Sequence, residues 1–121
     1  MANAAIFIGW GPAVAGREQQ ALQVFQEGLQ YWTRLQQQGE IESFEPVALE
    51  PHGGDLSGCC IIKGDREKLG RLRYTAEWQR LNARANTVVQ GLGVVDAHIG
   101  EGLQGLFGEF QQAAADLGGT R

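Results

Sequence analysis

The residues Asp96 and His98 carry the chemistry that the sequence suggests most directly. They are the two ionisable side chains of the strand-like run Gly91-Leu-Gly-Val-Val-Asp-Ala-His-Ile-Gly100. Alternate residues of a strand share one face, so the carboxylate and the imidazole would lie together, as proton transfer requires. We therefore take them as candidate catalytic and ligand-binding residues. A hydrogen-bonded pair at a dimer boundary, or a solvated strand end, explains the same pattern without catalysis.

Three aromatic residues complete the candidate ligand-binding set. Trp10 closes the first predicted strand, and Tyr74 and Trp78 stand at the break in a predicted helix. Trp and Tyr combine an apolar ring with a polar group, so they suit the mouth of a pocket. Packing in the core is their ordinary role and is the alternative here.

The turn at residues 11–18 resembles a phosphate-binding loop in its place between a strand and a helix. Arg17 stands where such a loop has its lysine, and Glu18 stands where it has the magnesium-binding hydroxyl. Gly9 and Gly11 begin a dinucleotide-binding pattern that no third glycine completes. We therefore expect no nucleotide cofactor, and an ordinary strand-to-helix turn explains the glycines.

A metal site is not predicted either. His52 lies in a dense turn signal, and no pair of histidines or cysteines has the spacing of metal ligands. A haem site has no support beyond the presence of two histidines. Cys59 and Cys60 are adjacent, which disfavours a disulfide between them and predicts two buried free thiols.

Composition limits the class of protein and its partners. The 121 residues are 43% hydrophobic and 20% charged, with a formal net charge of −4, which fits one soluble domain. Nucleic-acid binders usually carry a basic patch, so we expect no nucleic-acid partner. The sequence shows no signal peptide and no membrane-spanning segment, so we expect a cytoplasmic protein without a membrane partner.

The apolar pattern then places the elements. Strands are predicted at residues 4–10, 41–50, 57–63 and 90–100, and helices at 17–37, 66–73, 76–88 and 101–117. Gly16 is the expected N-cap of the first helix, Gly39 its stop, and Thr75 the N-cap after the break. Pro46 predicts an edge strand with a bulge, because proline donates no ladder hydrogen bond.

This order predicts an α+β fold, a single ferredoxin-like βαββαβ domain spanning residues 1–121. Its core covers about residues 4–100, with a four-stranded antiparallel sheet, a broken second helix and an extra C-terminal helix. Both crossover helices lie on one face of such a sheet, so the other face stays open. Because the first, third and fourth strands are apolar on both faces, a second copy is the expected cover.

The chain thus resembles the dimeric α+β barrel superfamily. The resemblance covers about residues 4–100 and rests on the element order, the broken helix around Tyr74-Thr75-Ala76-Glu77-Trp78-Gln79 and the strand Val94-Val95-Asp96-Ala97-His98-Ile99. No characterised family within it is identified. The resemblance implies a homodimer, and its members include cofactor-free monooxygenases, isomerases, haem enzymes and proteins without a known role.

Three functions remain open from the sequence. The first is a homodimeric barrel that binds a small, largely apolar organic ligand between sheet and helices, with Asp96 and His98 as polar anchors. The second is a cofactor-independent monooxygenase or isomerase with His98 as general base. The third is a structural or protein-interaction module that uses the C-terminal helix. If Val95, Ala97 and Ile99 pack on the helices, Asp96 and His98 point into the space between two sheets.

Overall fold

The structure, a computed structural model, describes residues 2–118. Its elements follow in the order β1 (Ala4–Trp10), α1 (Glu18–Gln37), β2 (Ser43–Ala48), β3 (Gly58–Gly64), α2 (Arg66–Leu72), α3 (Ala76–Val88), β4 (Gly93–Ala97) and α4 (Gly100–Gly118). The strands form one antiparallel sheet in the order β2-β3-β1-β4. The predicted α+β ferredoxin-like fold with a broken second helix is confirmed.

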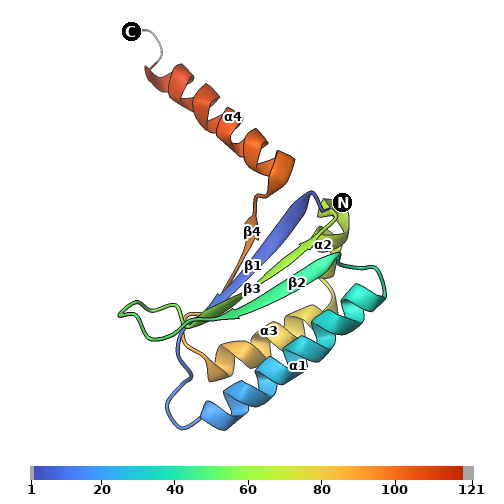
Figure 1. Cartoon of the computed structure of the whole chain (residues 1–121), viewed down its shortest axis with the longest axis vertical. Helices are drawn as coiled ribbons and strands as arrows, with labels where there is room; N and C mark the ends of the chain where they lie inside the picture. The colour runs from blue at the N-terminus through green and yellow to red at the C-terminus, as the bar shows by residue number, and fades with distance from the viewer. Residues whose placement is uncertain (1, 119–121) are drawn as a thin grey trace.

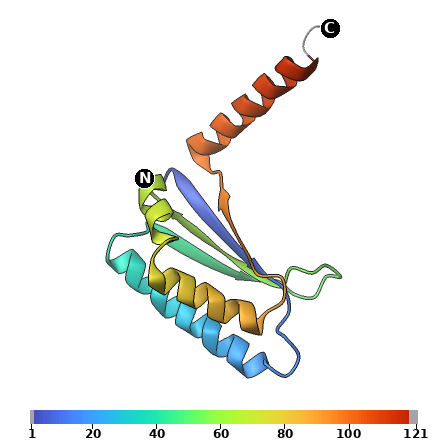
Figure 2. The ribbon, with the colours of Figure 1, turned by 180° about the vertical axis from the view of Figure 1, so that it is seen from behind.

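The helices cover one face of this sheet. Figure 1 shows α1 and α3 side by side beneath the strands, and the reverse view in Figure 2 shows the same layering. The core lies between the two layers and contains Ile6, Ile8, Cys60 and Ile62 of the sheet. Full burial of each such isoleucine stabilises the fold by about 1.5–3 kcal/mol. Helix residues complete this core, namely Tyr31, Trp32, Leu35, Leu69, Leu72 and Trp78.

The break between α2 and α3 falls where the sequence predicts it. Thr75 is the N-cap of α3, and its hydroxyl accepts a hydrogen bond from the backbone N–H of Trp78 at 3.4 Å. Asp65 caps α2 in the same way through the N–H of Lys68 at 3.2 Å. The break lets two short helices follow the twisted sheet with one apolar side each.

Two local predictions are wrong. The pairing of β2 with β3 runs from Ser43 to Ala48 without a skipped residue, so Pro46 causes no bulge. β2 is the edge strand that was predicted, and a proline at a free edge loses no ladder partner. Arg17, and not Gly16, is the N-cap of α1 and makes no side-chain capping bond. Gly39 does follow the end of α1, with a φ of 77° that suits glycine.

The second face of the sheet is open and largely apolar. Phe7, Ile61 and Val95 stand in register on it, and Val95 is 56% exposed. The neighbouring row, which contains Ile6 and Ile62, faces the helices. We call the surface formed by Phe7, Ile61 and Val95 the open face.

Candidate functional site: an apolar cavity between sheet and helices

The structure places Asp96 on the helix side of the sheet. Asp96 pairs in register with Ile6, which is 1% exposed in the core, and Val94 on the same face of β4 also packs against that core. It is Val95 that occupies the open face. The expectation that Val95, Ala97 and Ile99 pack on the helices is therefore wrong, and Asp96 does not point into a space between two sheets.

Arg73, at the end of α2, holds the Asp96 carboxylate. Its Nη1 donates a hydrogen bond to Oδ1 of Asp96 at 2.8 Å, and its Nη2 lies 3.5 Å from the carbonyl of Val94. This ion pair ties the edge strand to α2. Sequence reasoning missed Arg73, because its contact with Asp96 joins residues 23 positions apart.

His98 lies just beyond the end of β4 and is exposed. Within residues 2–118 no hydrogen bond joins it to Asp96, so the predicted acid–base pair is not formed in this structure. The two side chains line one hollow of about 240 Å³, together with Asn3 and Arg66. It lies beside the end of β4, and we call it the polar hollow because Asp96, His98, Asn3 and Arg66 line it, together with small apolar residues.

The candidate aromatic residues do not converge on that hollow. Trp78 is 3% exposed and packs edge-to-face against Tyr31 at 6.5 Å between ring centres, whereas Tyr74 is 82% exposed. Trp10 stands at the other end of β1 from Ala5, the residue that pairs with Ala97. Five strand residues span about 17 Å, so Trp10 and His98 occupy opposite ends of the sheet.

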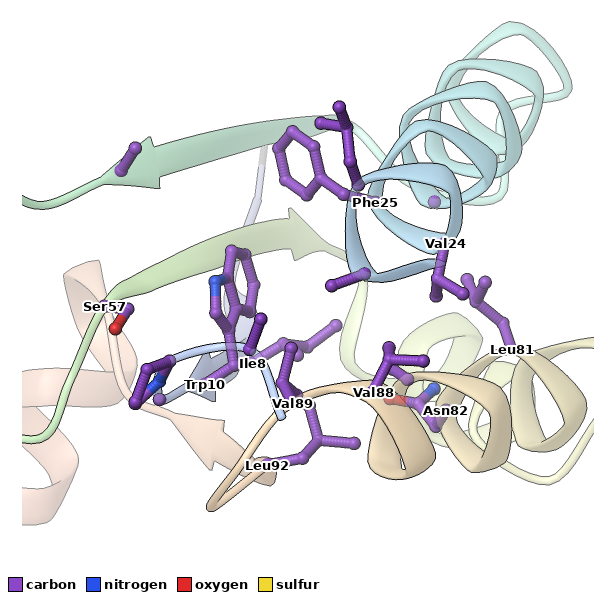
Figure 3. Close-up of a pocket in the computed structure, with 18 of the residues that line it drawn as sticks. Ile8, Trp10, Val24, Phe25, Ser57, Leu81, Asn82, Val88, Val89 and Leu92 are labelled. Atoms are coloured by element: carbon purple, nitrogen blue, oxygen red, sulfur yellow. The ribbon is translucent and has the colours of Figure 1, made fainter. Parts of the chain in front are cut away.

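A cavity opens beside Trp10. It has a volume of about 450 Å³ and lies between α1, α3 and the end of β1 (Figure 3). Its size falls within the range of small-molecule sites, roughly 300–1,000 Å³. The residues that line it are Ile8, Trp10, Gly11, Pro12, Ala13, Ala21, Leu22, Val24, Phe25, Gly28, Trp32, Val47, Ala48, Ser57, Leu81, Asn82, Ala85, Val88, Val89 and Leu92.

Two aromatic rings shape one side of the cavity. Trp10 and Phe25 meet edge-to-face with 5.8 Å between ring centres, and Figure 3 shows them reaching toward each other from β1 and α1. The indole of Trp10 lies against Gly58, where a Cβ atom would come within 2.9 Å of it. Glycine at this position therefore leaves room for the ring beside β3.

The lining carries no charged side chain, and its polar side chains besides the indoles are Ser57 and Asn82. Figure 3 shows these two on opposite sides of the cavity. The amide nitrogen of Asn82 donates to the carbonyl of Trp78 at 2.9 Å, which leaves its oxygen as an acceptor. The buried Nε1–H of Trp32 has no hydrogen-bond partner within residues 2–118. The arrangement can enclose an apolar molecule and offer it a few polar contacts.

Most of this cavity was not predicted as a site. Leu81, Ala85 and Val88 lie on one line of α3, within the predicted helix of residues 76–88, and none of them was a candidate site residue. The signal that could have found them is the small size of Ala21 and Ala85, which leaves space between two helices that lie side by side. Of the predicted ligand-binding residues, Trp10 alone lines the cavity.

The remaining histidine, His52, and the two cysteines have structural roles. Within residues 2–118 no group of three or more His, Cys, Asp or Glu side chains is arranged for a metal ion. His52 donates from Nε2 to the carbonyl of Leu56 at 2.9 Å and accepts at Nδ1 from the N–H of Gly54, which closes the β2–β3 loop. Cys59 and Cys60 are free and buried, as predicted, and burial raises the pKa of Cys60 to about 12.

No protein-family model and no curated protein matches this sequence. Solved structures do match in three dimensions. A dimeric ferredoxin-like protein of unknown function from Thermobifida fusca has a TM-score of 0.62 at 11% identity, covering 82% of this chain and 93% of its own. The fold is that of the dimeric ferredoxin-like proteins.

Among residues 2–118, no helix is long and apolar enough to cross a membrane.

The similar structures include enzymes. SnoaB, a cofactor-independent oxygenase from Streptomyces nogalater, has a TM-score of 0.56 at 13% identity, covering 82% of this chain and 95% of its own. Hydroxynitrile lyase from Passiflora edulis has a TM-score of 0.62 at 11% identity, covering 84% of this chain and 97% of its own. Since one fold serves different reactions, these likenesses establish the architecture and leave the activity to the site.

Proposed function

We propose that the protein binds a small, neutral, largely apolar organic molecule in the cavity between α1, α3 and the end of β1. The observation that carries the proposal is a lining without any charged side chain around about 450 Å³ of space. An ionised ligand would lose its hydration there without gaining a counter-charge, whereas an apolar one gains about 25 cal/mol for each Å² removed from water.

The polar atoms of the lining narrow the class of ligand. The hydroxyl of Ser57 at the cavity wall can donate a hydrogen bond to the ligand or accept one from it. The free oxygen of Asn82 would take a donor. These contacts favour a molecule with an apolar body and one or two neutral polar groups, such as a carbonyl or hydroxyl. Asp96 and His98, which we first expected as anchors, lie outside this cavity.

Fluorescence titration with 1-aminoanthracene, a neutral apolar probe, tests the proposal. Ala85→Phe fills the space between the helices and should raise the dissociation constant at least about tenfold, which is about 1.4 kcal/mol. Ala83→Phe, on the exposed side of the same helix, is the matched control and should bind as the wild type does. Equal binding by both variants, with both folded by circular dichroism, would place the probe elsewhere.

We also propose that two copies associate through the open face. Exposed apolar residues on a sheet favour a covering partner, and Val95 is 56% exposed at its free edge. Similar solved structures are described as dimeric, which supports the same arrangement for this chain. A role for His98 as general base stays a hypothesis, because its imidazole lies outside the cavity and would need a substrate held in the separate polar hollow.

A further inference from the structure

The apolar side of helix α4 is not covered by the rest of the described chain. It runs from Gly100 to Gly118, and none of its residues is buried. Its apolar side chains form a stripe of about a third of its circumference, the pattern of a helix that packs on a surface. The large ones are exposed by 39% at Leu103, 55% at Phe107, 63% at Phe110 and 91% at Leu117.

This helix is poorly suited to stand alone in water. Gly105 and Gly108, in the helix interior, each cost about 1 kcal/mol relative to alanine. Most helical stability in proteins comes from packing of an apolar side and not from helix propensity, and α4 has no buried residue. A stable α4 therefore needs contact with another surface.

The chain's own domain does not supply that surface. β4 ends at Ala97 and α4 begins at Gly100, so two residues join them. Both views of the ribbon show α4 leading away from the sheet and from the helix layer (Figures 1 and 2). Only the first turn approaches the domain, where Gly102 lines the polar hollow beside Asn3.

We propose that α4 is an arm that each of two copies packs on the other. The exposed fractions of Phe107 and Phe110 correspond to about 200 Å², since an aromatic side chain buries about 150–250 Å². With the leucines, one stripe offers on the order of 400 Å², already the size of a functional patch.

The area favours a second copy over an unrelated partner. One arm on a foreign protein would bury about 800 Å² in total, the size of a crystal contact, whereas two exchanged arms bury about 1,600 Å², the size of a stable interface. Reciprocal contact of this kind is what a two-fold dimer provides. The area buried by two exchanged arms is thus large enough for a stable dimer, whereas the area buried by one arm is not.

The arm also continues the surface that the second copy is proposed to cover. Ala97 lies on the same side of β4 as Val95, which belongs to the open face. The helix α4 begins three residues after Ala97. A copy seated on the open face is therefore adjacent to α4. The inference rests on the homodimer proposed above and adds the arm to it.

A matched pair of double variants tests the arm. Phe107→Ser with Phe110→Ser removes the two aromatic rings of the stripe, and Gln104→Ser with Gln112→Ser introduces the same two serines on the opposite side of α4. By sedimentation equilibrium, the first should raise the dimer dissociation constant at least about tenfold, or about 1.4 kcal/mol, and the second should leave it unchanged. Equal constants for both variants and the wild type would overturn the arm while leaving the open-face dimer intact.

Amide hydrogen exchange on the wild type gives a second readout that needs no variant. Protection along residues 103–117 should be present in concentrated samples and lost on dilution to the monomer. Protection that persists in the monomer would mean that α4 folds back on its own domain, and a wild type that is monomeric at all concentrations would also overturn the arm. Binding of 1-aminoanthracene by the cavity is measured separately, so failure of the arm and of the ligand site remain distinguishable.

Discussion

The Asp96 carboxylate accepts a hydrogen bond from Arg73 at 2.8 Å, while 74% of its side-chain surface faces solvent. Water screens such a pair, and exposed ion pairs are usually worth about 0–1 kcal/mol. Asp96→Asn should therefore lower the free energy of unfolding in urea by no more than about 1 kcal/mol. A loss of several kcal/mol would show that this ion pair organises more of the structure than its exposure indicates.

His98 lies outside the cavity, so removing its side chain should not change the affinity for a ligand bound there. His98→Ala is expected to bind 1-aminoanthracene with the dissociation constant of the wild type, because the cavity lies near the other end of β1. The same titration run on Trp10→Ala should show weaker binding, since Trp10 forms part of the lining. If binding were weakened in His98→Ala but not in Trp10→Ala, the probe would bind in the polar hollow and not in the cavity.

The thiol of Cys60 makes stability depend on pH. Burial raises its pKa from 9.0 to about 12, so the folded chain keeps a proton that the unfolded chain releases. This contribution is complete below pH 9 and is lost as the pH rises from 9 toward 12. Burial also raises the pKa of Tyr31 from 10.0, which acts in the same direction.

The free energy of unfolding should accordingly fall as the pH rises above 9, measured by urea unfolding between pH 7 and 10.5. Cys60→Ala should fall less steeply over the same range, because it lacks one of the two buried acids. Parallel profiles for the two proteins would show that the thiol does not contribute.

Sequence reasoning identified Trp10 as a candidate ligand residue and Cys60 as a buried thiol. It could not orient Asp96, because both faces of the run at residues 90–100 carry apolar residues and either could meet the helices. The deciding partner, Arg73, comes from a helix 23 residues earlier, a contact that local periodicity does not reveal. Sequence reasoning expected a ligand between sheet and helices but missed most of the residues that line the cavity, because an unfilled space between helices has the same apolar pattern as a filled one.

At the scale of elements, the cap at Thr75 separates α2 from α3. The apolar residues of these two helices would not lie on one side of a single continuous helix. Thr75→Ala removes the acceptor for the Trp78 N–H and should cost about 1 kcal/mol of the free energy of unfolding. Thr33→Ala, on the exposed side of α1, is the matched control and should change it by no more than about 0.5 kcal/mol. Equal losses in urea unfolding would mean that the cap does not fix the break.

The elements themselves were largely predictable. Their order, the capped break and the edge position of β2 follow from turn residues and apolar periodicity, which are local properties. The bulge at Pro46 was wrong because an edge strand tolerates proline without distortion. The exposure of α4 was not predictable, since an amphipathic stripe does not tell which surface it meets.

At the scale of the whole molecule, the open face should control association. Val95→Glu places a charge on the exposed apolar edge of that face and should weaken the dimer at least about tenfold, or about 1.4 kcal/mol, by light scattering across a dilution series. Ala83→Glu, exposed on α3, should leave the dimer unchanged. A Val95→Glu protein as dimeric as the wild type would place the contact on another surface.

The cavity between sheet and helices is the central claim, and the position of a bound molecule tests it most directly. We would follow backbone amide signals by NMR during titration with 1-aminoanthracene. The largest shift changes should fall on residues 81–92 and on Trp10, with little change at Asp96 and His98. Changes centred on Asp96 and His98, or no saturable change at all, would contradict the proposed site.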